Sequence, residues 1–587
     1  MKKIIACILL ITLFATLSAC SGYAMSATTE ADTTANTQQT PEVTVVPISV
    51  EYEDDDLTTG ASSATTTTIE LDDDTTTFNG NGVAVDGNIV TITSAGTYNI
   101  SGTLNDGQLV VDTEDEETVV LVLDGVDITC ATSAPIYIIN AEKTVITLAD
   151  GSENYVTDGA SYVFADAETD EPNAAIFSKD DLTINGDGAL TVNANYNNGI
   201  ASKDDLKITG GNITVNAVND GIKGKDSVAV LAGTLTVVAG SDGLQASNVE
   251  EADKGYIAIE GGTLNVTAGL DAIQAETSLL VSGGDLTLTS GSGQNSAADS
   301  TKGLKAGVDI TITGGTFEID ADDDAIHSND SLTIDDGVFL LTSGDDGIHA
   351  EYSLTINGGD INVLQSFEGL ESALITTNDG NIRLVTSDDG LNATTGNGGG
   401  QADSSYFYIN GGYVVVNAEG DGLDSNGTAV MTGGVVIVQG PTTSKNGPID
   451  VNGEFVISGG FLISAGSAGM PEIPSTTSTQ NSIAVAFDSA LSGGTLIHVE
   501  TVDGEEVLTY ESPKAFQLFV FSSPELQTNT TYTVYVDGEA TGTVTDGLYS
   551  DGRYTPGTQA TSLAISSSVT TAGNFQSSGG GPGRSRP

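Results

Sequence analysis

The chain has 587 residues, more than one compact hydrophobic core supports, so we expect several domains or one elongated array. It has 72 glycines and no tryptophan, and Thr, Asn, Asp and Val are frequent, which favours strands and turns over helices. The formal net charge of −64 argues against a nucleic-acid partner, since phosphate binding needs clustered Lys and Arg, and suggests an acidic surface or a protein that binds cations.

The N-terminus reads as a targeting signal. Residues 1–19 contain two lysines followed by an apolar stretch, and "LSAC" ends at Cys20, which is typical of a bacterial lipobox whose cysteine carries lipid. An ordinary secreted signal is the alternative. We therefore expect a lipoprotein on the extracellular face of a bacterial envelope, anchored only at Cys20, with the Thr/Ala/Ser-rich residues 20–45 as a tether. Acylation of Cys20 would leave Cys130 without a disulfide partner.

Four further segments follow the tether. Residues 46–170 are strand-rich but irregular, and we expect them to form the first coils or a cap. Residues 171–474 hold a repeat. Residues 475–560 are again strand-rich and predict a C-terminal β cap, which would cover the bare strand edges at that end. Residues 561–587 are predicted to be a disordered tail.

The repeat has a base period of 22 residues, with insertions. Its units align on a small residue that is followed by an aliphatic one. The aliphatic residues are Ile176, Ile200, Ile222, Leu244, Ile273, Leu304, Ile326, Ile348, Leu370, Leu391, Leu423 and Ile449.

Each unit contains about three short alternating strands joined by tight turns, often with Gly-Gly, and none could bury its apolar side alone. Stacking the units in parallel buries the aliphatic residues in one core. The sequence therefore predicts an all-β fold, a parallel β-helix of about 12 coils. We take it as right-handed, because parallel crossovers almost always are.

An acidic column precedes the aliphatic one. Stacked carboxylates about 5 Å apart repel by roughly 1 kcal/mol in water and by roughly 3–4 kcal/mol at an effective dielectric constant of 20. They could be protonated, cap local turns, or bind cations, and hard oxygen ligands favour Ca²⁺. The candidate calcium ligands are Asp220, Asp242, Asp271, Asp322, Asp323, Asp324, Asp345, Asp346, Glu368, Asp388, Asp389 and Asp421.

A polar line follows one residue after the aliphatic column, and we expect it to point outward. Its mixture of amides, acids and bases would suit a hydroxyl-rich or uronic-acid polymer. The candidate carbohydrate-binding residues are Gln245, Gln274, His327, His349, Glu371, Asn392 and Asp424. The two histidines are 22 residues apart and should stack, either as an exposed polar ladder, which we expect, or as metal ligands. Tyr162, Tyr196, Tyr352 and Tyr406 could stack on sugars, although we expect them to serve packing.

The lipobox, the Thr-rich tether, the "DDGIHA…LTINGGDINV" units and the terminal "SSPEL…TTYTVYVDGEATG" resemble a bacterial family of carbohydrate-binding parallel β-helix proteins. The family was once a domain of unknown function and is typified by a clostridial protein that binds cellulose and polygalacturonate. The resemblance covers about residues 60–560. It implies a calcium-bearing right-handed β-helix, shaped like a pectate lyase, that binds plant cell-wall polysaccharide without known cleavage.

Three functions remain open at this point. The first is non-catalytic, calcium-dependent polysaccharide binding at the cell surface by a monomer. The second is a polysaccharide lyase, in which Lys223, Lys305 or Arg383 would take a proton beside a calcium ion. The third is a structural surface adhesin.

Overall fold

The computed structural model describes residues 48–59, 66–164, 166, 169–291, 300–396 and 403–575. The predicted signal peptide, Cys20 and the tether lie outside the described residues, as does the end of the predicted tail. The described part is nearly all β, and its single helix is the short α1 (Asp54–Leu57). No helix among these residues is both long and apolar enough to cross a bilayer.

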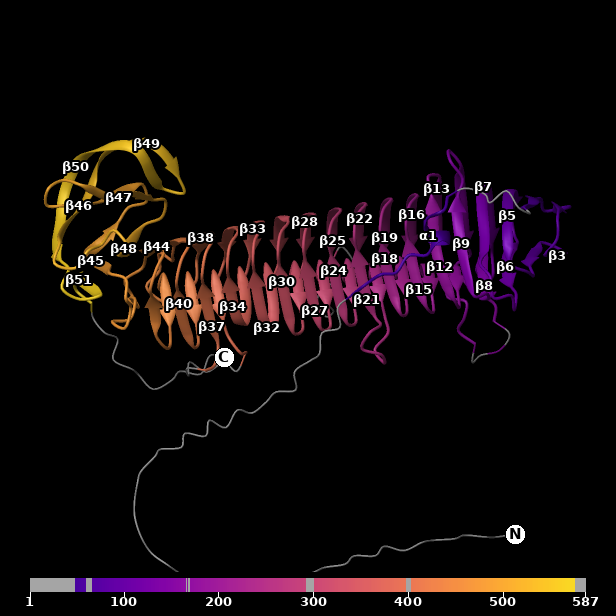
Figure 1. Cartoon of the computed structure of the whole chain (residues 1–587), viewed down its shortest axis with the longest axis horizontal. Coiled ribbons are helices and arrows are strands. Elements are labelled where there is room, and N and C mark those ends of the chain that lie inside the picture. The colour runs from indigo at the N-terminus through magenta and orange to yellow at the C-terminus, as the bar shows by residue number, and fades with distance from the viewer. Residues whose placement is uncertain are drawn as a thin grey trace, which may run out of the picture. The chain divides into compact units, whose positions relative to one another are not determined.

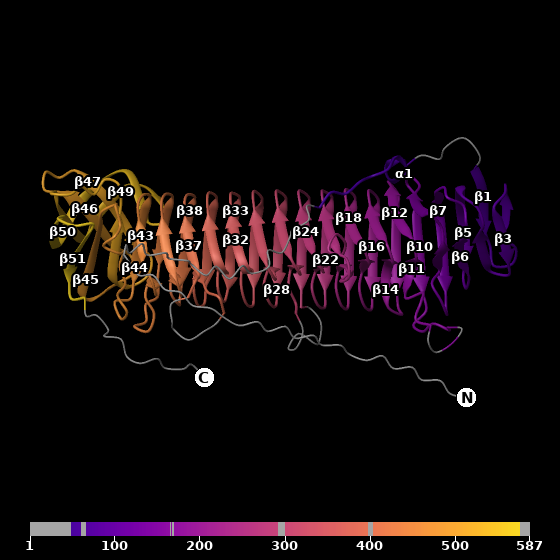
Figure 2. The ribbon, with the colours of Figure 1, turned by 60° about the horizontal axis from the view of Figure 1, so that its bottom comes forward.

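Most strands belong to one long, mostly parallel sheet, in which a strand usually pairs with the strand three places further along the chain and in some coils with the strand two places further along. In one coil these are β26 (Leu304–Ala306), β27 (Asp309–Ile312) and β28 (Thr316–Ala321). Their partners in the next coil are β29 (Ile326–Ser328), β30 (Ser331–Ile334) and β31 (Val338–Ser343). Successive coils thus lie side by side in chain order, and the predicted all-β, β-helix-like architecture is confirmed (Figures 1 and 2).

The aliphatic column forms a continuous buried ladder. Each of its twelve residues, from Ile176 to Ile449, is the register partner of the next, and each is at most 1% exposed. Full burial of one such side chain contributes roughly 1.5–3 kcal/mol. The strands of this column beyond β14 (Asn198–Ser202) are β17 (Ile222–Gly224), β20 (Leu244–Ala246), β23 (Ile273–Ala275), β26, β29, β32 (Ile348–Ile356), β34 (Leu370–Thr377), β36 (Leu391–Ala393), β39 (Leu423–Ser425) and β42 (Ile449–Val451).

The second glycine of the Gly-Gly pairs turns the chain at the corner before the third strand of each coil. Gly284 has a φ of +102° and Gly315 a φ of +110°. Residues with a Cβ rarely adopt this region, so the corner needs glycine. Glycine at this corner gives successive coils the same turn before the third strand, which helps that strand to stay in register with its neighbours.

The N-terminal segment is held against the outside of the coils by one buried carboxylate. Asp56 in α1 is fully buried, and its Oδ1 lies 2.7 Å from Lys143 Nζ of β9 (Lys143–Leu148). Thr183 of β12 (Asp181–Gly186) donates a hydrogen bond to the same carboxylate, and Lys207 Nζ of β15 (Asp205–Ile208) lies 3.5 Å from it. This single residue therefore ties the segment to three neighbouring coils.

The C-terminal end of the long sheet is closed by antiparallel pairing. Strand β48 (Phe516–Ser522) pairs with both β44 (Phe461–Gly466) and β45 (Ser482–Leu491), so the edge of the last coil is covered. The following strands form a closed barrel, which consists of β46 (Thr495–Thr501), β47 (Glu506–Ser512), β49 (Thr531–Thr545) and β50 (Leu548–Ala564).

The expectation of a disordered tail from residue 561 is wrong for its first part. Strand β50 runs to Ala564, and β51 (Val569–Gly573) pairs in parallel with β45. The alternating Val569–Ala572 stretch supplies backbone donors and acceptors to the free side of β45, and this pairing outweighs the low-complexity composition that suggested disorder.

Removing one aromatic ring from the core tests how much the stacked side chains stabilise the fold, apart from the strand propensity of single residues. Phe339 is fully buried and stacks on Phe317 with ring centroids 4.6 Å apart, so Phe339→Ala should lower the free energy of unfolding by about 3–5 kcal/mol. Val338→Ala, at a neighbouring position that is 51% exposed, should cost less than about 1 kcal/mol. Urea unfolding followed by circular dichroism measures both. Equal losses in the two variants would contradict the stacked core.

Candidate functional site

In most of the acidic column, one carboxylate oxygen accepts a hydrogen bond from the backbone of the next coil. The Oδ1 of Asp242 accepts a hydrogen bond from the backbone N–H of Asp271 at 3.1 Å, and the Oδ1 of Asp324 accepts one from the N–H of Asp346 at 2.9 Å. The sequence left three ways to tolerate the stacked carboxylates, namely protonation, capping of local turns and cation binding. The capping was expected to stay within one coil. It instead runs from coil to coil, so the carboxylates are held in line even though they repel each other.

The second oxygen faces the polar line, where its partner changes along the column. In the N-terminal and central coils the partner is usually a lysine or an amide. The polar-line pairs are Lys223–Asp220 at 2.9 Å, Gln245–Asp242 at 2.6 Å and Lys305–Asp271 at 3.0 Å. Asp324 is also bound at 2.7 Å by Lys302, which stands at the acidic-column position of its own coil. These contacts bring most polar-line residues against the column. The polar line points away from the core beside the acidic column, as expected, but its residues are half-buried or, for His327 and Asn392, buried, so the line is less exposed than expected.

The lyase alternative loses one of its three candidate bases. Arg383 lies on β35 (Asn381–Thr386), a different strand column, where its guanidinium is 3.0 Å from the carboxylate of Asp546 and packs over the ring of Tyr413. Lys223 and Lys305 do lie beside the acidic column, but each ammonium is already bound to a carboxylate.

In the coils of Asp324 and Asp346, the polar-line partners of the carboxylates are two histidines. His327 and His349 are register partners, as predicted, and their ring centroids are 4.8 Å apart. Burial disfavours the charged form of Asp324. The hydrogen bonds from His327 and His349 and the charge of Lys302 outweigh burial and lower the pKa of Asp324. Burial likewise opposes charge on His349, yet its bonds to Asp324 and Asp346 raise the pKa of His349 to about 10.

Toward the C-terminal end, carboxylates meet without basic partners. Asp389, Asp421 and Asp424 each offer an oxygen, and the three oxygens lie within 4.8 Å of one another. Among the described residues, no Lys, Arg or His forms an ion pair with any of the three. Backbone N–H groups are donated to two of them, from Asp421 to Asp389 and from Gly447 to Asp421, each at 2.6 Å.

Crowding of these acids makes it costly to charge them all. Burial and the charge of Asp388 raise the pKa of Asp389 to about 7. Burial and the charge of Asp389 raise the pKa of Asp424 to about 9, and burial raises the pKa of Asp421 to about 7. Three carboxylates that face one another supply the hard oxygen donors that Ca²⁺ prefers, so the residues present fit the calcium ion that the sequence resemblance implies.

A neighbouring acid was not found from the sequence. Glu472 lies after the last coil, where its Oε2 accepts a hydrogen bond from the backbone N–H of Val451 at 2.8 Å. Burial and the charge of Asp450 raise the pKa of Glu472 to about 7. The residue follows the last aligned unit of the repeat, the one that contains Ile449, so no periodic signal could have placed it beside the column.

The remaining candidates divide according to their surroundings. Further groups of possible metal ligands are Asp323, Asp324 and Asp345; Asp324, His327 and His349; and Asp346, His349 and Glu371. The others belong to no such group among the described residues. Asp220, Asp242 and Asp271 stand in the column beside Lys or Gln, Asp322 is exposed, and Glu368 shares Asn392 with Glu371. Gln274 contacts Gln245 and Glu276.

The tyrosines serve different ends. Tyr162 stacks on Tyr196 with ring centroids 4.2 Å apart, and its hydroxyl donates to Asp158, so this pair packs a loop, as expected. Tyr352 is 52% exposed, and Tyr406 packs edge-on against Tyr408, which is 37% exposed. Of the four candidate tyrosines, Tyr352 and Tyr406 are therefore the two that keep ring surface for a ligand.

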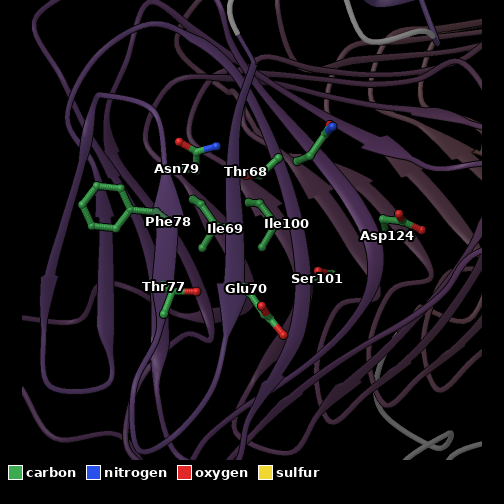
Figure 3. Close-up of a pocket in the computed structure, with 10 residues that line it drawn as sticks. Thr68, Ile69, Glu70, Thr77, Phe78, Asn79, Ile100, Ser101 and Asp124 are labelled. Carbon is green, nitrogen blue, oxygen red and sulfur yellow. The ribbon is translucent and has the colours of Figure 1, made fainter.

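A cavity of about 450 Å³ lies far from the acidic column, at the N-terminal end of the sheet. Figure 3 shows its lining from β1 (Thr66–Leu71), β2 (Thr77–Asn79) and β5 (Gly96–Leu104), with Phe78 at one side and Asp124 at the other. None of the candidate site residues lines it, so the acidic column is the better candidate site.

Comparison with known proteins agrees with a carbohydrate-related role. A family model described as carbohydrate-binding domain-containing protein matches residues 86–347 and 345–517. The chain belongs to this carbohydrate-binding domain family. A protein of the same description from Acetivibrio thermocellus (strain ATCC 27405) is 62% identical over 178 residues, which are 30% of this chain and 62% of that relative.

One solved structure is also similar. It is titled as the polysaccharide lyase-like protein from C. thermocellum, a gadolinium derivative, and it is 44% identical in sequence. The match covers 43% of this chain and 94% of the other, with a TM-score of 0.36.

The carboxylates without basic partners should give the protein an unusual pH dependence. The pKa values of Asp389, Asp421 and Asp424 are raised above the ordinary value for Asp, so the folded chain holds more protons than the unfolded chain between about pH 4 and about pH 9. The free energy of unfolding should therefore fall as pH rises through that window. The raised pKa of His349 acts in the same direction at the upper end.

Thermal melts in EDTA at several pH values measure this effect. Asp424→Asn should flatten the decline, because the amide carries no charge to lose. Asp320→Asn, at an exposed position on another strand column, should leave it unchanged. A wild-type melting temperature that rises or stays constant from about pH 5 to about pH 9 would contradict the proposed repulsion.

Proposed function

We propose that this protein is a lipid-anchored, non-catalytic surface protein that binds cell-wall polysaccharide, cellulose or an acidic pectin-type glycan, in a calcium-dependent manner. The observation that carries the proposal is the convergence of Asp389, Asp421 and Asp424, without a basic partner among the described residues, in a chain of a carbohydrate-binding family. A divalent cation there would remove the repulsion that raises their pKa values.

A calcium ion would stabilise the fold by offsetting the repulsion between carboxylates, and it would also bind oxygen atoms of the glycan. Ca²⁺ takes six to eight oxygen ligands, so three carboxylates leave positions for other oxygens. Hydroxyl or carboxylate oxygens of a glycan are of the kind that could fill them. An acidic polymer would otherwise be repelled by a chain of net charge −64, so a uronic-acid glycan needs such a bridging cation.

The polar line offers the remaining contacts. Gln245, Gln274, Glu371 and Asp424 stay partly exposed beside the column. The coils repeat at about 4.8 Å, so equivalent side chains recur at a constant step along the sheet. A linear polymer presents equivalent hydroxyl groups at a constant step as well, and one polymer could therefore contact several coils at once.

Binding to insoluble polysaccharide tests the proposal. Wild-type protein should be retained on cellulose or polygalacturonate beads in calcium and released by EDTA. The double variant Asp389→Asn/Asp424→Asn should lose most of its retention, whereas Asp320→Asn should bind like the wild type. Retention on no polymer, with or without calcium, would favour the adhesin alternative instead.

The same incubations separate binding from cleavage. A lyase would form unsaturated products from polygalacturonate, which absorb in the ultraviolet. We expect no sustained formation, because the ammonium groups of Lys223 and Lys305 must first leave Asp220 and Asp271 before either could act as a base. Steady product formation that Lys223→Ala or Lys305→Ala abolishes would overturn the non-catalytic proposal.

The anchor is tested separately. Expressed with its own signal in a bacterial host, the wild-type protein should partition into the detergent phase and incorporate labelled fatty acid. Cys20→Ser should move the protein to the aqueous phase and abolish labelling, while Cys130→Ser, at the buried free cysteine, should not. Labelling that persists in Cys20→Ser would contradict lipidation at this residue.

A further inference from the structure

We propose that His327, His349 and Asp324 form a second cation site, selective for a borderline transition-metal ion such as Zn²⁺ over Ca²⁺. This site is separate from the carboxylate cluster of Asp389, Asp421 and Asp424, and it does not depend on glycan binding.

The geometry brings the donors together from neighbouring coils. His327 Nδ1 lies 2.7 Å from Asp324 Oδ2, and His349 Nδ1 lies 3.7 Å from the same oxygen. Around a tetrahedral zinc ion, with bonds of about 2.0–2.1 Å, neighbouring ligand atoms are about 3.4 Å apart. The observed separations lie on either side of that value, and all three donor atoms lie within 4.8 Å of one another. Asp346, whose Oδ2 is 3.1 Å from His349 Nδ1, is close enough to be a further ligand.

The ring of His327 is already oriented as a metal ligand would be. Its Nε2 lies 3.0 Å from Asn329 Oδ1, which accepts the Nε2 hydrogen. Nδ1 donates to Asp324 while the ring is protonated, and in the neutral ring it has a lone pair directed at the same carboxylate oxygen, where an ion would take the place of the proton. Two acceptors at 2.7 Å need a cation or a proton between them. A hydrogen bond from the outer nitrogen is also the arrangement that fixes ligating histidines in metal sites.

Donor chemistry decides which cation would bind here. Two imidazole nitrogens and a carboxylate suit zinc and its transition-metal neighbours, whereas calcium takes oxygen ligands. Both histidines are at least four-fifths buried, so a bound ion would be shielded from water by the coils on either side. The chain has only three histidines, and the third, His498, lies in the C-terminal barrel, where it contacts Thr509.

Lys302 is the main competitor for the site. Its Nζ is 2.7 Å from Asp324 Oδ2 and 2.8 Å from Asp323 Oδ2. Asp323 is a second partner of the Lys302 ammonium. A metal ion could therefore bind Asp324 while the ammonium keeps its ion pair with Asp323. Removing this lysine should therefore strengthen metal binding, an effect that a purely structural histidine pair would not produce.

Calorimetric titration of Zn²⁺ into the full-length protein, with calcium held at saturation, tests the proposal. We expect one zinc ion per chain, at least about tenfold weaker binding in His327→Gln and His349→Gln, and tighter binding in Lys302→Met. His498→Gln should bind like the wild type, with circular dichroism confirming the fold of each variant. Cobalt as a substitute should give visible absorption bands typical of nitrogen ligation.

Two results would overturn it. The first is zinc binding of equal strength in the wild type and both histidine variants, which would mean adventitious binding to the acidic surface. The second is zinc binding that saturating calcium abolishes, which would mean a single oxygen site with no preference for nitrogen. Because no glycan is present in this titration, either failure is distinct from a failure to bind polysaccharide.

Discussion

Register between stacked coils is the constraint on which this molecule depends. Once Ile326 pairs with Ile348 and Ile348 with Leu370, every other position of the repeat must align in a column of its own. For aliphatic residues this alignment is favourable, because it builds a continuous core. For carboxylates it is unfavourable, because it forces like charges into line. The acidic column is therefore a cost that the fold imposes and that its neighbours must offset.

The chain offsets that cost differently along the column. Lysines and amides face the carboxylates in the N-terminal coils, as at Asp220 and Asp242, and two histidines follow at Asp324 and Asp346. Beyond Glu368, acids face acids. This gradient from fixed positive charge to none explains why the pKa of Asp324 is lowered while the pKa of Asp421 is raised, although both stand at the acidic-column position of the repeat. It also marks the C-terminal coils as the place where an external cation would contribute most.

Periodicity made much of this arrangement predictable from the sequence. The aliphatic column, the stacking of His327 on His349 and the glycine corners all follow from the 22-residue spacing, because parallel register turns sequence repeats into spatial columns. The periodic pattern could not show which way each second carboxylate oxygen turns. It therefore missed the coil-to-coil capping by Asp242 and the half-burial of the polar line. Contacts made by segments that follow the regular coils escaped it as well. Glu472 reaches Val451 from a loop after the coils, and Arg383, on the coil strand β35, has its partner Asp546 in the barrel, far away in sequence.

We propose that the carboxylates without basic partners at the C-terminal end of the column are stabilised by a divalent cation. Calorimetric titration of Ca²⁺ into EDTA-stripped protein tests it most directly, in the wild type and in a variant in which Asp389, Asp421 and Asp424 are all replaced by Asn. The account predicts saturable calcium binding in the wild type, accompanied by proton release near neutral pH, and its loss in the variant. Saturable calcium binding that is unchanged by the three replacements, or its absence from the wild type, would contradict the account.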